Sequence, residues 1–178
     1  MSGTHGTTVL SVRRGAEAAI GGDGQVTLDH TIVKHTALKI RELHHGRVLV
    51  GFAGATADAL HLLEIFDTKL GECDGRVSKA AIELARAWRT DRTLRHLEAI
   101  LNVISREESL LITGRGDVIA PDDGVIGIGS GGSYAVAAAR ALVAHTGLSA
   151  AAIVRTALEI AAGLCVYTNR NIEVRELV

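Results

Sequence analysis

Near its start the chain reads Gly6-Thr7-Thr8-Val9-Leu10-Ser11-Val12. The run after Gly6 is rich in β-branched and apolar residues, so it predicts a first strand that begins at Thr8. Cleavage after Gly6 would leave Thr7 as a new amino terminus directly before that strand. An N-terminal threonine carries a nucleophilic hydroxyl and a basic α-amine in one residue. The stretch therefore predicts a fold that starts with a strand, and it offers a candidate nucleophile.

The residues before Thr7 are small and polar and lack the apolar segment of a secretory signal. We interpret residues 1–6 as a disposable pro-segment or a disordered tail, and residues 7–178 as one domain. A plainer interpretation is that Gly-Thr-Thr only opens an ordinary strand, because threonine is common in strands.

Composition limits the classes of function. The chain has 178 residues, and a 47% hydrophobic content is enough for one compact core. Its net charge of −1 and 3% aromatic content argue against nucleic-acid or anionic-membrane binding. No apolar stretch is long enough for a membrane span. Cys73 and Cys165 lie too far apart in sequence to suggest a CxxC pair or a disulfide framework, so a reducing cytoplasm is the expected location.

Hydrophobic periodicity predicts strands first and a pair of helices next. Strands are expected at Thr8–Arg13, Ala18–Gly22, Ile32–Ile40 and Arg47–Ala53. The period then becomes helical, with a helix starting near Thr56 as its N-cap and a second helix over Val77–Trp88.

The same block pattern follows a second time. Strands are expected at Ala99–Ser105, Ser109–Thr113, Val118–Ala120 and Val125–Ile128, helices at Tyr134–His145 and Ser149–Leu164, and a last strand at Ile172–Leu177. Strands and helices that alternate in blocks indicate the α+β class. Two sheets with a helical layer on each outer side would bury every apolar stripe.

Two charged residues stand near the first strands. Asp23 lies in the glycine-rich turn Gly21–Gly24, where it is expected to be poorly shielded, although Asp-Gly is also a common hairpin turn. Lys39 lies in the predicted strand Ile32–Ile40, either as a solvated edge residue or as a cation near a reactive group. With Thr7 they form the set that an N-terminal-nucleophile hydrolase uses: a lysine charge disfavours protonation of the α-amine and helps the hydroxyl ionise, and an aspartate fixes the lysine.

Six stretches along the chain match one known family in order and spacing. They are TTVLSVRR (Thr7–Arg14), GDGQVT (Gly22–Thr27), GFAGATAD (Gly51–Asp58), WRTDR (Trp88–Arg92), IGSGG (Ile128–Gly132) and YTN (Tyr167–Asn169). From Thr7 onward the chain resembles the HslV family, bacterial relatives of the proteasome β-subunit. The resemblance implies a four-layer αββα sandwich of the N-terminal-nucleophile hydrolase type and a threonine endopeptidase that frees Thr7 by cutting the Gly6–Thr7 bond itself.

The resemblance also assigns site residues. It makes Thr7 the nucleophile, Asp23 and Lys39 its supporting pair, and Ser130 a serine that hydrogen-bonds near the threonine amine. It places the oxyanion hole in the Gly51–Gly54 loop, with the N–H of Gly54 as the expected donor. It further implies a structural sodium ion on the backbone carbonyls of Ala162, Cys165 and Thr168. In two features the chain departs from the family: the leader is longer than a single methionine, and Ala162 replaces a usual glycine.

Partners too follow from the resemblance. The family forms two stacked hexameric rings that enclose the active sites, and an HslU-type ATP-dependent unfoldase delivers unfolded protein chains. The sequence contains no P-loop, consistent with ATP use by the partner. The alternative is a non-catalytic structural subunit of such a ring. Subunits of that kind typically lose the threonine or the lysine, and both are present here.

Three other patterns suggest different functions. Gly127–Gly132 spells GxGxxG, as in dinucleotide-binding proteins, but two helices are predicted in succession after it and Glu159, the nearest later acid, falls in mid-helix. The arginines of the second predicted helix and the segment after it alternate with acids, which favours a solvated or salt-bridged face over nucleic-acid binding. The histidines, including His44 and His45, show no metal-ligand spacing and are expected on the surface or in turns.

Overall fold

The computed structural model describes residues 4–5, 7–92, 94–97 and 99–177. Two antiparallel sheets form its centre. The five-stranded sheet has the order β10-β9-β8-β7-β6, formed by β6 (Ile40–Leu43), β7 (Val48–Gly54), β8 (Ala99–Ile104), β9 (Ser109–Thr113) and β10 (Val118–Ile119). The four-stranded sheet has the order β11-β2-β3-β12, formed by β2 (Thr8–Arg14), β3 (Glu17–Gly22), β11 (Val125–Gly129) and β12 (Glu173–Leu177). A small third sheet joins β1 (Thr4–His5), β4 (Val26–Leu28) and β5 (Thr31–Lys34).

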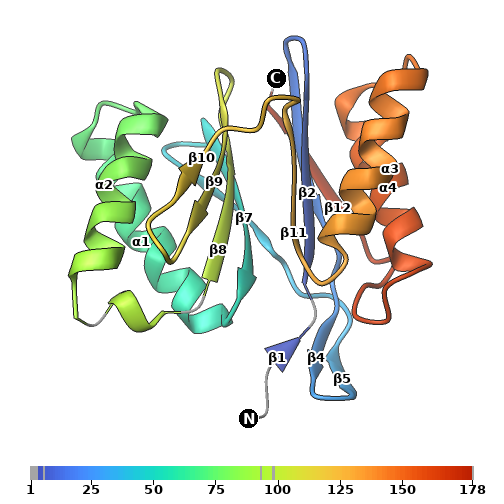
Figure 1. Cartoon of the computed structure of the whole chain (residues 1–178), viewed down its shortest axis with the longest axis horizontal. Coiled ribbons are helices and arrows are strands. Elements are labelled where there is room, and N and C mark those ends of the chain that lie inside the picture. The colour runs from blue at the N-terminus through green and yellow to red at the C-terminus, as the bar shows by residue number, and fades with distance from the viewer. Residues whose placement is uncertain (1–3, 6, 93, 98, 178) are drawn as a thin grey trace.

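Helices cover the outer face of each main sheet (Figure 1). The pair α1 (Thr56–Glu72) and α2 (Val77–Thr90) packs on the five-stranded sheet, and a short 3₁₀ turn, η1 (Leu94–His96), follows it. The pair α3 (Gly132–His145) and α4 (Ala150–Ala162) packs on the four-stranded sheet. The predicted four-layer αββα arrangement and the α+β class are confirmed.

Each helical layer buries the apolar stripe that its sequence predicts. On α2 the buried residues recur at helical spacing from Val77 to Trp88, and they pack with Leu62 and Phe66 of α1 against the five-stranded sheet. On the other side, Ile153 and Leu158 of α4 pack with small alanines of α3 against β2. Burial of these stripes is the main stabilising contribution to the outer layers.

A third apolar cluster lies between the two sheets, with Val9, Ile20, Leu49 and Ile126 among its members. Here β7 lies close to β2: a Cβ built on Gly51 would lie only 2.4 Å from Cγ1 of Val9. A side chain at position 51 would therefore push the sheets apart, and glycine allows the contact.

Several predicted boundaries are wrong. The strand expected over Ile32–Ile40 is two strands, β5 and β6, because the backbone between them bonds to loops: Ala37 N–H donates to the Gly24 carbonyl, and the carbonyl of His35 accepts from two asparagine side chains. Strands β1 and β4 were not predicted. Helix α1 starts at Thr56 with Ala55 as its N-cap, α4 ends at Ala162, and β12 starts at Glu173.

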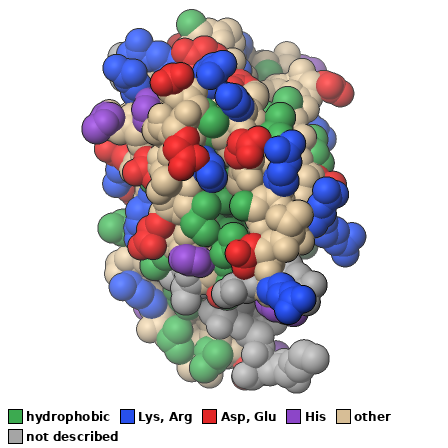
Figure 2. All heavy atoms as spheres, turned by 90° about the vertical axis from the view of Figure 1, so that its left-hand side faces the viewer, with side chains coloured by type: hydrophobic (Ala, Val, Ile, Leu, Met, Phe, Trp, Pro, Cys, Tyr) green, Lys and Arg blue, Asp and Glu red, His purple; other side chains and the backbone are tan. Residues whose placement is uncertain are grey.

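The surface over α1 and α2 carries interspersed basic and acidic side chains (Figure 2). On α2, Arg86 pairs with Glu83 at 3.2 Å, as the interpretation of a salt-bridged helix face predicts. Within the described ranges, every helix falls short of the length and hydropathy that a membrane crossing requires.

Candidate active site

Thr7 is held at the entrance to β2 by the loop that follows β11. The backbone N–H of Ser130 donates to the carbonyl oxygen of Thr7 at 2.9 Å. Gly129 has a φ of +84°, and a Cβ there would lie 1.9 Å from that same oxygen, so the loop passes Thr7 at a distance that only glycine permits. The main chain of Thr7 is therefore positioned by β11 as well as by β2.

Thr8 is a heavily hydrogen-bonded residue of the site whose role was not predicted from the sequence. It is fully buried, and its N–H donates to Oδ1 of Asp23 at 2.8 Å. Its hydroxyl accepts the N–H of Gly131 at 3.0 Å and shares a 2.7 Å hydrogen bond with the hydroxyl of Thr168. These three contacts tie the residue next to Thr7 to β3, to the start of α3 and to the loop after α4.

Asp23 is buried, which corrects the expectation that it is poorly shielded. Its Oδ1 receives the Lys39 ammonium at 2.7 Å, and its Oδ2 accepts the backbone N–H groups of Gln25 and Asn169 at 2.9 and 3.2 Å. The turn is not a hairpin, since β3 and β4 belong to different sheets. A carboxylate that accepts this many hydrogen bonds is fixed in orientation.

Lys39 lies just before β6 and is also buried. Its ammonium donates to the Gln25 carbonyl at 2.7 Å in addition to Asp23. Burial lowers the pKa of Lys39 from its ordinary value, although the negative charge of Asp23 and the hydrogen bond to it act in the opposite direction. Of the two predicted alternatives, burial excludes a solvated edge lysine, and the role of a cation held near a reactive group stays a prediction.

Gly54 and Ser130 complete the predicted set. Gly54 ends β7 with a φ of +111°, and Figure 1 places that end of β7 at the same end of the sandwich as the start of β2. Ser130 is exposed, and its contact with Thr7 is through the backbone. Their roles as oxyanion donor and as serine partner of the amine stay predictions. Gly6, on the other side of the predicted cleavage bond, lies outside the described residues.

The three residues predicted to hold sodium lie at the end of α4 and in the loop after it. Ala162 is the last helical residue, so its carbonyl belongs to the final turn, which lacks intrahelical donors. The carbonyl of Cys165 accepts the N–H of Thr168 at 3.1 Å and keeps a second lone pair. Neutral carbonyl oxygens suit a hard cation, so the residues present fit the expected ion. The ion itself stays a prediction.

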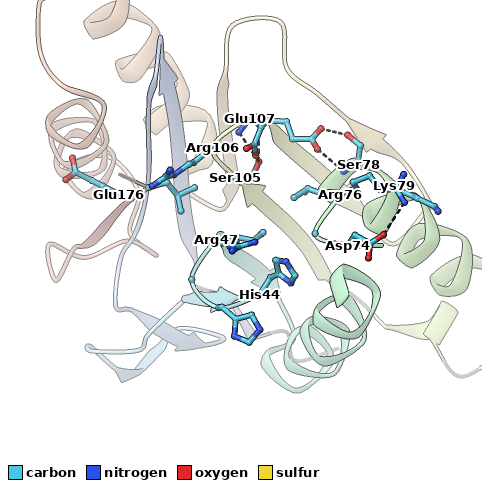
Figure 3. A pocket seen from close by; sticks show the side chains of 17 residues that line it. His44, Arg47, Asp74, Arg76, Ser78, Lys79, Ser105, Arg106, Glu107 and Glu176 are labelled. Carbon is cyan, nitrogen blue, oxygen red and sulfur yellow. Dashed lines mark hydrogen bonds and ion pairs between the residues drawn. The ribbon is translucent and has the colours of Figure 1, made fainter. Parts of the chain in front are cut away.

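A cavity of about 1030 Å³ lies elsewhere (Figure 3). Its walls are the turns between β6 and β7, α1 and α2, and β8 and β9, together with the end of β12; His44 and Arg47 are among the lining residues. Strand β7 runs from Val48 at this cavity toward Gly54, so the cavity lies at the opposite end of the strand from the candidate site. None of the predicted site residues lines it.

The rival functions find no support in this geometry. The GxGxxG loop follows β11, which runs antiparallel to β2, and a dinucleotide fold requires a parallel strand–helix–strand unit. His44 and His45 lie in the turn after β6, and the described residues form no group of three or more His, Cys, Asp or Glu side chains fit for a metal.

Comparisons with known proteins cover nearly the whole chain. The family model for the proteasome subunit matches residues 4–177. The ATP-dependent protease subunit HslV of Chlorobium luteolum is 57% identical over 171 residues, which cover 96% of this chain and 94% of that protein. The crystal structure of eukaryotic HslV from Trypanosoma brucei superposes with a TM-score of 0.91 at 48% identity, covering 96% of this chain and 98% of that one. Thiobacillus denitrificans BPH, 18% identical with a TM-score of 0.75, covers 96% of this chain and 97% of that one and shares the fold.

Proposed function

The chain belongs to the proteasome subunit family and is a proteolytic subunit of the HslV type, part of an ATP-dependent protease, and we propose that Thr7 is the nucleophile of this threonine peptidase. The observation that carries the proposal is the buried chain of contacts from Lys39 through Asp23 to the backbone N–H of Thr8. It fixes a cation and a carboxylate beside the residue that follows Thr7. A purely structural subunit has no need of such a pair, so that alternative is not favoured.

The reaction is acyl transfer to the threonine hydroxyl. The α-amine of processed Thr7 takes the hydroxyl proton as the oxygen attacks a peptide carbonyl, and it then returns a proton to the leaving amine. Asp23 holds the Lys39 ammonium in place, and this positive charge favours the neutral amine over the protonated one. The N–H of Gly54 stabilises the oxyanion, and water finally releases the acyl group from Thr7.

Processing of residues 1–6 precedes this chemistry, because Thr7 has no free amine until the Gly6–Thr7 bond is cut. In the uncleaved chain Thr4 and His5 pair with Leu28 and Thr27 of β4 in antiparallel register. That pairing holds the backbone of Thr4 and His5 in an extended conformation. The expectation of a disordered tail therefore does not hold for the backbone of Thr4 and His5.

A sodium ion on the carbonyls of Ala162, Cys165 and Thr168 would supply a fixed positive charge at the end of α4. The hydroxyl of Thr168 bonds to that of Thr8, and the N–H of Asn169 bonds to Asp23. An ion that holds this loop in place would therefore also hold Thr8 and Asp23, the two residues that support Thr7.

Family membership supports a proposal for the assembly as well. The subunit forms two stacked hexameric rings with the threonines inside, and an HslU-type unfoldase in the cytoplasm feeds unfolded protein chains to them. Exclusion of folded proteins from the chamber supplies selectivity that the open site of a single subunit would lack.

Intact mass of purified protein tests the proposal, with wild-type, Thr7→Ala and Thr7→Ser chains side by side. Loss of residues 1–6 in the wild type, with Thr7→Ala uncut, assembled and inactive, is the expected result; Thr7→Ser is expected to keep weak activity. Peptidase activity that persists in highly purified Thr7→Ala would overturn the assignment.

A further inference from the structure

A fully buried polar bridge crosses the apolar layer between the two sheets. The hydroxyl of Ser11 on β2 donates to Oδ1 of Asn102 on β8 at 2.8 Å, and Nδ2 of Asn102 donates to the carbonyl of Ile126 on β11 at 3.1 Å. Both polar side chains are fully buried. One amide therefore connects a strand of the five-stranded sheet to two strands of the four-stranded sheet.

The surroundings of this bridge are aliphatic, with side chains of valine, isoleucine, leucine and alanine from both sheets. Contacts of that kind are non-directional, and similar packing is compatible with small shifts of one sheet over the other. The amide is directional, because a shift that breaks its hydrogen bonds leaves buried polar groups unpaired. The bridge therefore favours one offset between the sheets in the interior, while the bonds from Arg13 on β2 to Ser109 and to the carbonyls of Ser105 and Glu108 act at one end of the strands.

The strands that meet at the bridge are those that lead to the candidate site. Ser11 lies on β2, which begins beside Thr7, and Ile126 faces Ser11 across the ladder on β11, which leads to Ser130. Asn102 faces Gly51 on β7, which ends at Gly54. At about 3.3 Å per residue, each of these strand segments is roughly 10–13 Å long. The relative position of β2 and β8 at the bridge thus sets the relative position of Thr7, the proposed nucleophile, and Gly54, the proposed oxyanion donor.

We propose that the Ser11–Asn102–Ile126 bridge is a positioning device for catalysis, in which Asn102 fixes the separation between the Thr7 hydroxyl and the Gly54 N–H. This inference rests on the proposed function, because it assigns Thr7 and Gly54 their roles. Asn102 does not touch the reacting atoms and acts only through the strands that carry them. Its removal should therefore lower kcat more than it changes KM, and it should leave the pH profile of the reaction unaltered.

Two variants separate the effect of the bridge on the stability of the protein from its effect on the positioning of the catalytic groups. Asn102→Leu leaves the Ser11 hydroxyl unpaired and should lower both the melting temperature and kcat. The double variant Ser11→Ala/Asn102→Leu also removes the Ser11 hydroxyl, so only the Ile126 carbonyl loses a partner and the melting temperature should recover part of the loss. Its kcat on a fluorogenic peptide should stay about tenfold lower, since sub-ångström to ångström misplacement has effects of this size or larger.

Ile104→Val is the matched control, because it removes one methylene from the same inter-sheet cluster without touching the bridge. It should lower the melting temperature and leave kcat unchanged in protein whose processing and assembly are verified by mass. A wild-type kcat in the double variant, or a kcat that falls with melting temperature in Ile104→Val, would overturn the inference while Thr7→Ala remains inactive. Activity in Thr7→Ala would instead refute the proposed function itself.

Discussion

The Lys39 ammonium lies 2.7 Å from Oδ1 of Asp23, and that same oxygen accepts the backbone N–H of Thr8 at 2.8 Å. Both charged side chains are almost completely removed from solvent, with exposed fractions of 4% and 0%. A buried ion pair is costly to form, and its retention is easiest to understand where the charges have a chemical task. Here the pair joins the segment before β6 to β2, the strand that follows the proposed nucleophile Thr7.

Asp23→Asn should be strongly destabilising, because it leaves the Lys39 ammonium buried without its counter-charge. The free energy of unfolding, measured by denaturant titration, should fall by about 3–5 kcal/mol, and peptidase activity should be lost. Glu83→Gln breaks the exposed pair with Arg86 and should cost less than about 1 kcal/mol. Similar losses in the two variants would contradict the importance of burial.

Stability in alkaline solution should respond to Lys39. Its pKa is lowered in the folded protein, so between that pKa and 10.5 the unfolded chain binds more protons than the folded one. Titration of Lys39 therefore makes the free energy of unfolding rise with pH between these two values. Below the pKa of the folded protein, Lys39 is protonated in both states and contributes no pH dependence. Denaturation midpoints at fixed protein concentration should rise with pH in the wild type relative to Lys39→Met. A constant difference between the two proteins would show that the pKa is not lowered.

The hydroxyl of Thr8 should matter although Thr7, and not Thr8, is the proposed nucleophile. Thr8→Val keeps the shape of the side chain but leaves the N–H of Gly131 and the hydroxyl of Thr168 without this partner. The free energy of unfolding should fall by about 1–3 kcal/mol, and kcat should fall with it. Thr8→Ser retains the hydroxyl and should stay close to the wild type in both measurements. Equal behaviour of the valine and serine variants would rule out the hydrogen bonds as the cause.

Gly129→Ala should displace Thr7. The new Cβ would lie 1.9 Å from the Thr7 carbonyl oxygen, and the φ of +84° disfavours any side chain. A displacement of about 1 Å at the nucleophile should lower kcat by about 100-fold. Gly147→Ala, where an added Cβ meets no atom within 4 Å, should leave peptidase kinetics unchanged. Full activity of Gly129→Ala would mean that the loop does not position Thr7.

Sodium should raise thermal stability if the carbonyls of Ala162, Cys165 and Thr168 bind it. The melting temperature in sodium chloride should exceed that in choline chloride at equal ionic strength, because choline is too large for such a site and binding to the folded state alone stabilises it. Identical melting temperatures in the two salts would argue against the ion.

The sequence predicted the order of the major elements well, because the apolar stripes of α1, α2 and α4 follow helical spacing and β2, β7 and β8 are short apolar runs. It failed at Ile32–Ile40, where β-branched residues suggested one strand. Backbone groups between β5 and β6 find partners in loops from residues 24 and 169–171, and such long-range bonds leave no local pattern. The site residues Thr7, Asp23 and Lys39 came from motif and spacing, whereas Thr8, Gln25 and Asn169 were missed as ordinary polar residues.

The sequence by itself determines the local chemistry: the Thr7 hydroxyl, the glycines at positions 51 and 129, and the hydrophobic periodicity by which each helix packs one face against a sheet. The burial of Asp23, the contact of Thr168 with Thr8 and the bridge from Asn102 to Ser11 arise only in three dimensions. They join residues up to 160 positions apart, and their energies depend on the exclusion of water by layers that form together. The sequence therefore suffices to propose Thr7 as the nucleophile, but the contacts proposed to support it exist only in the folded sandwich.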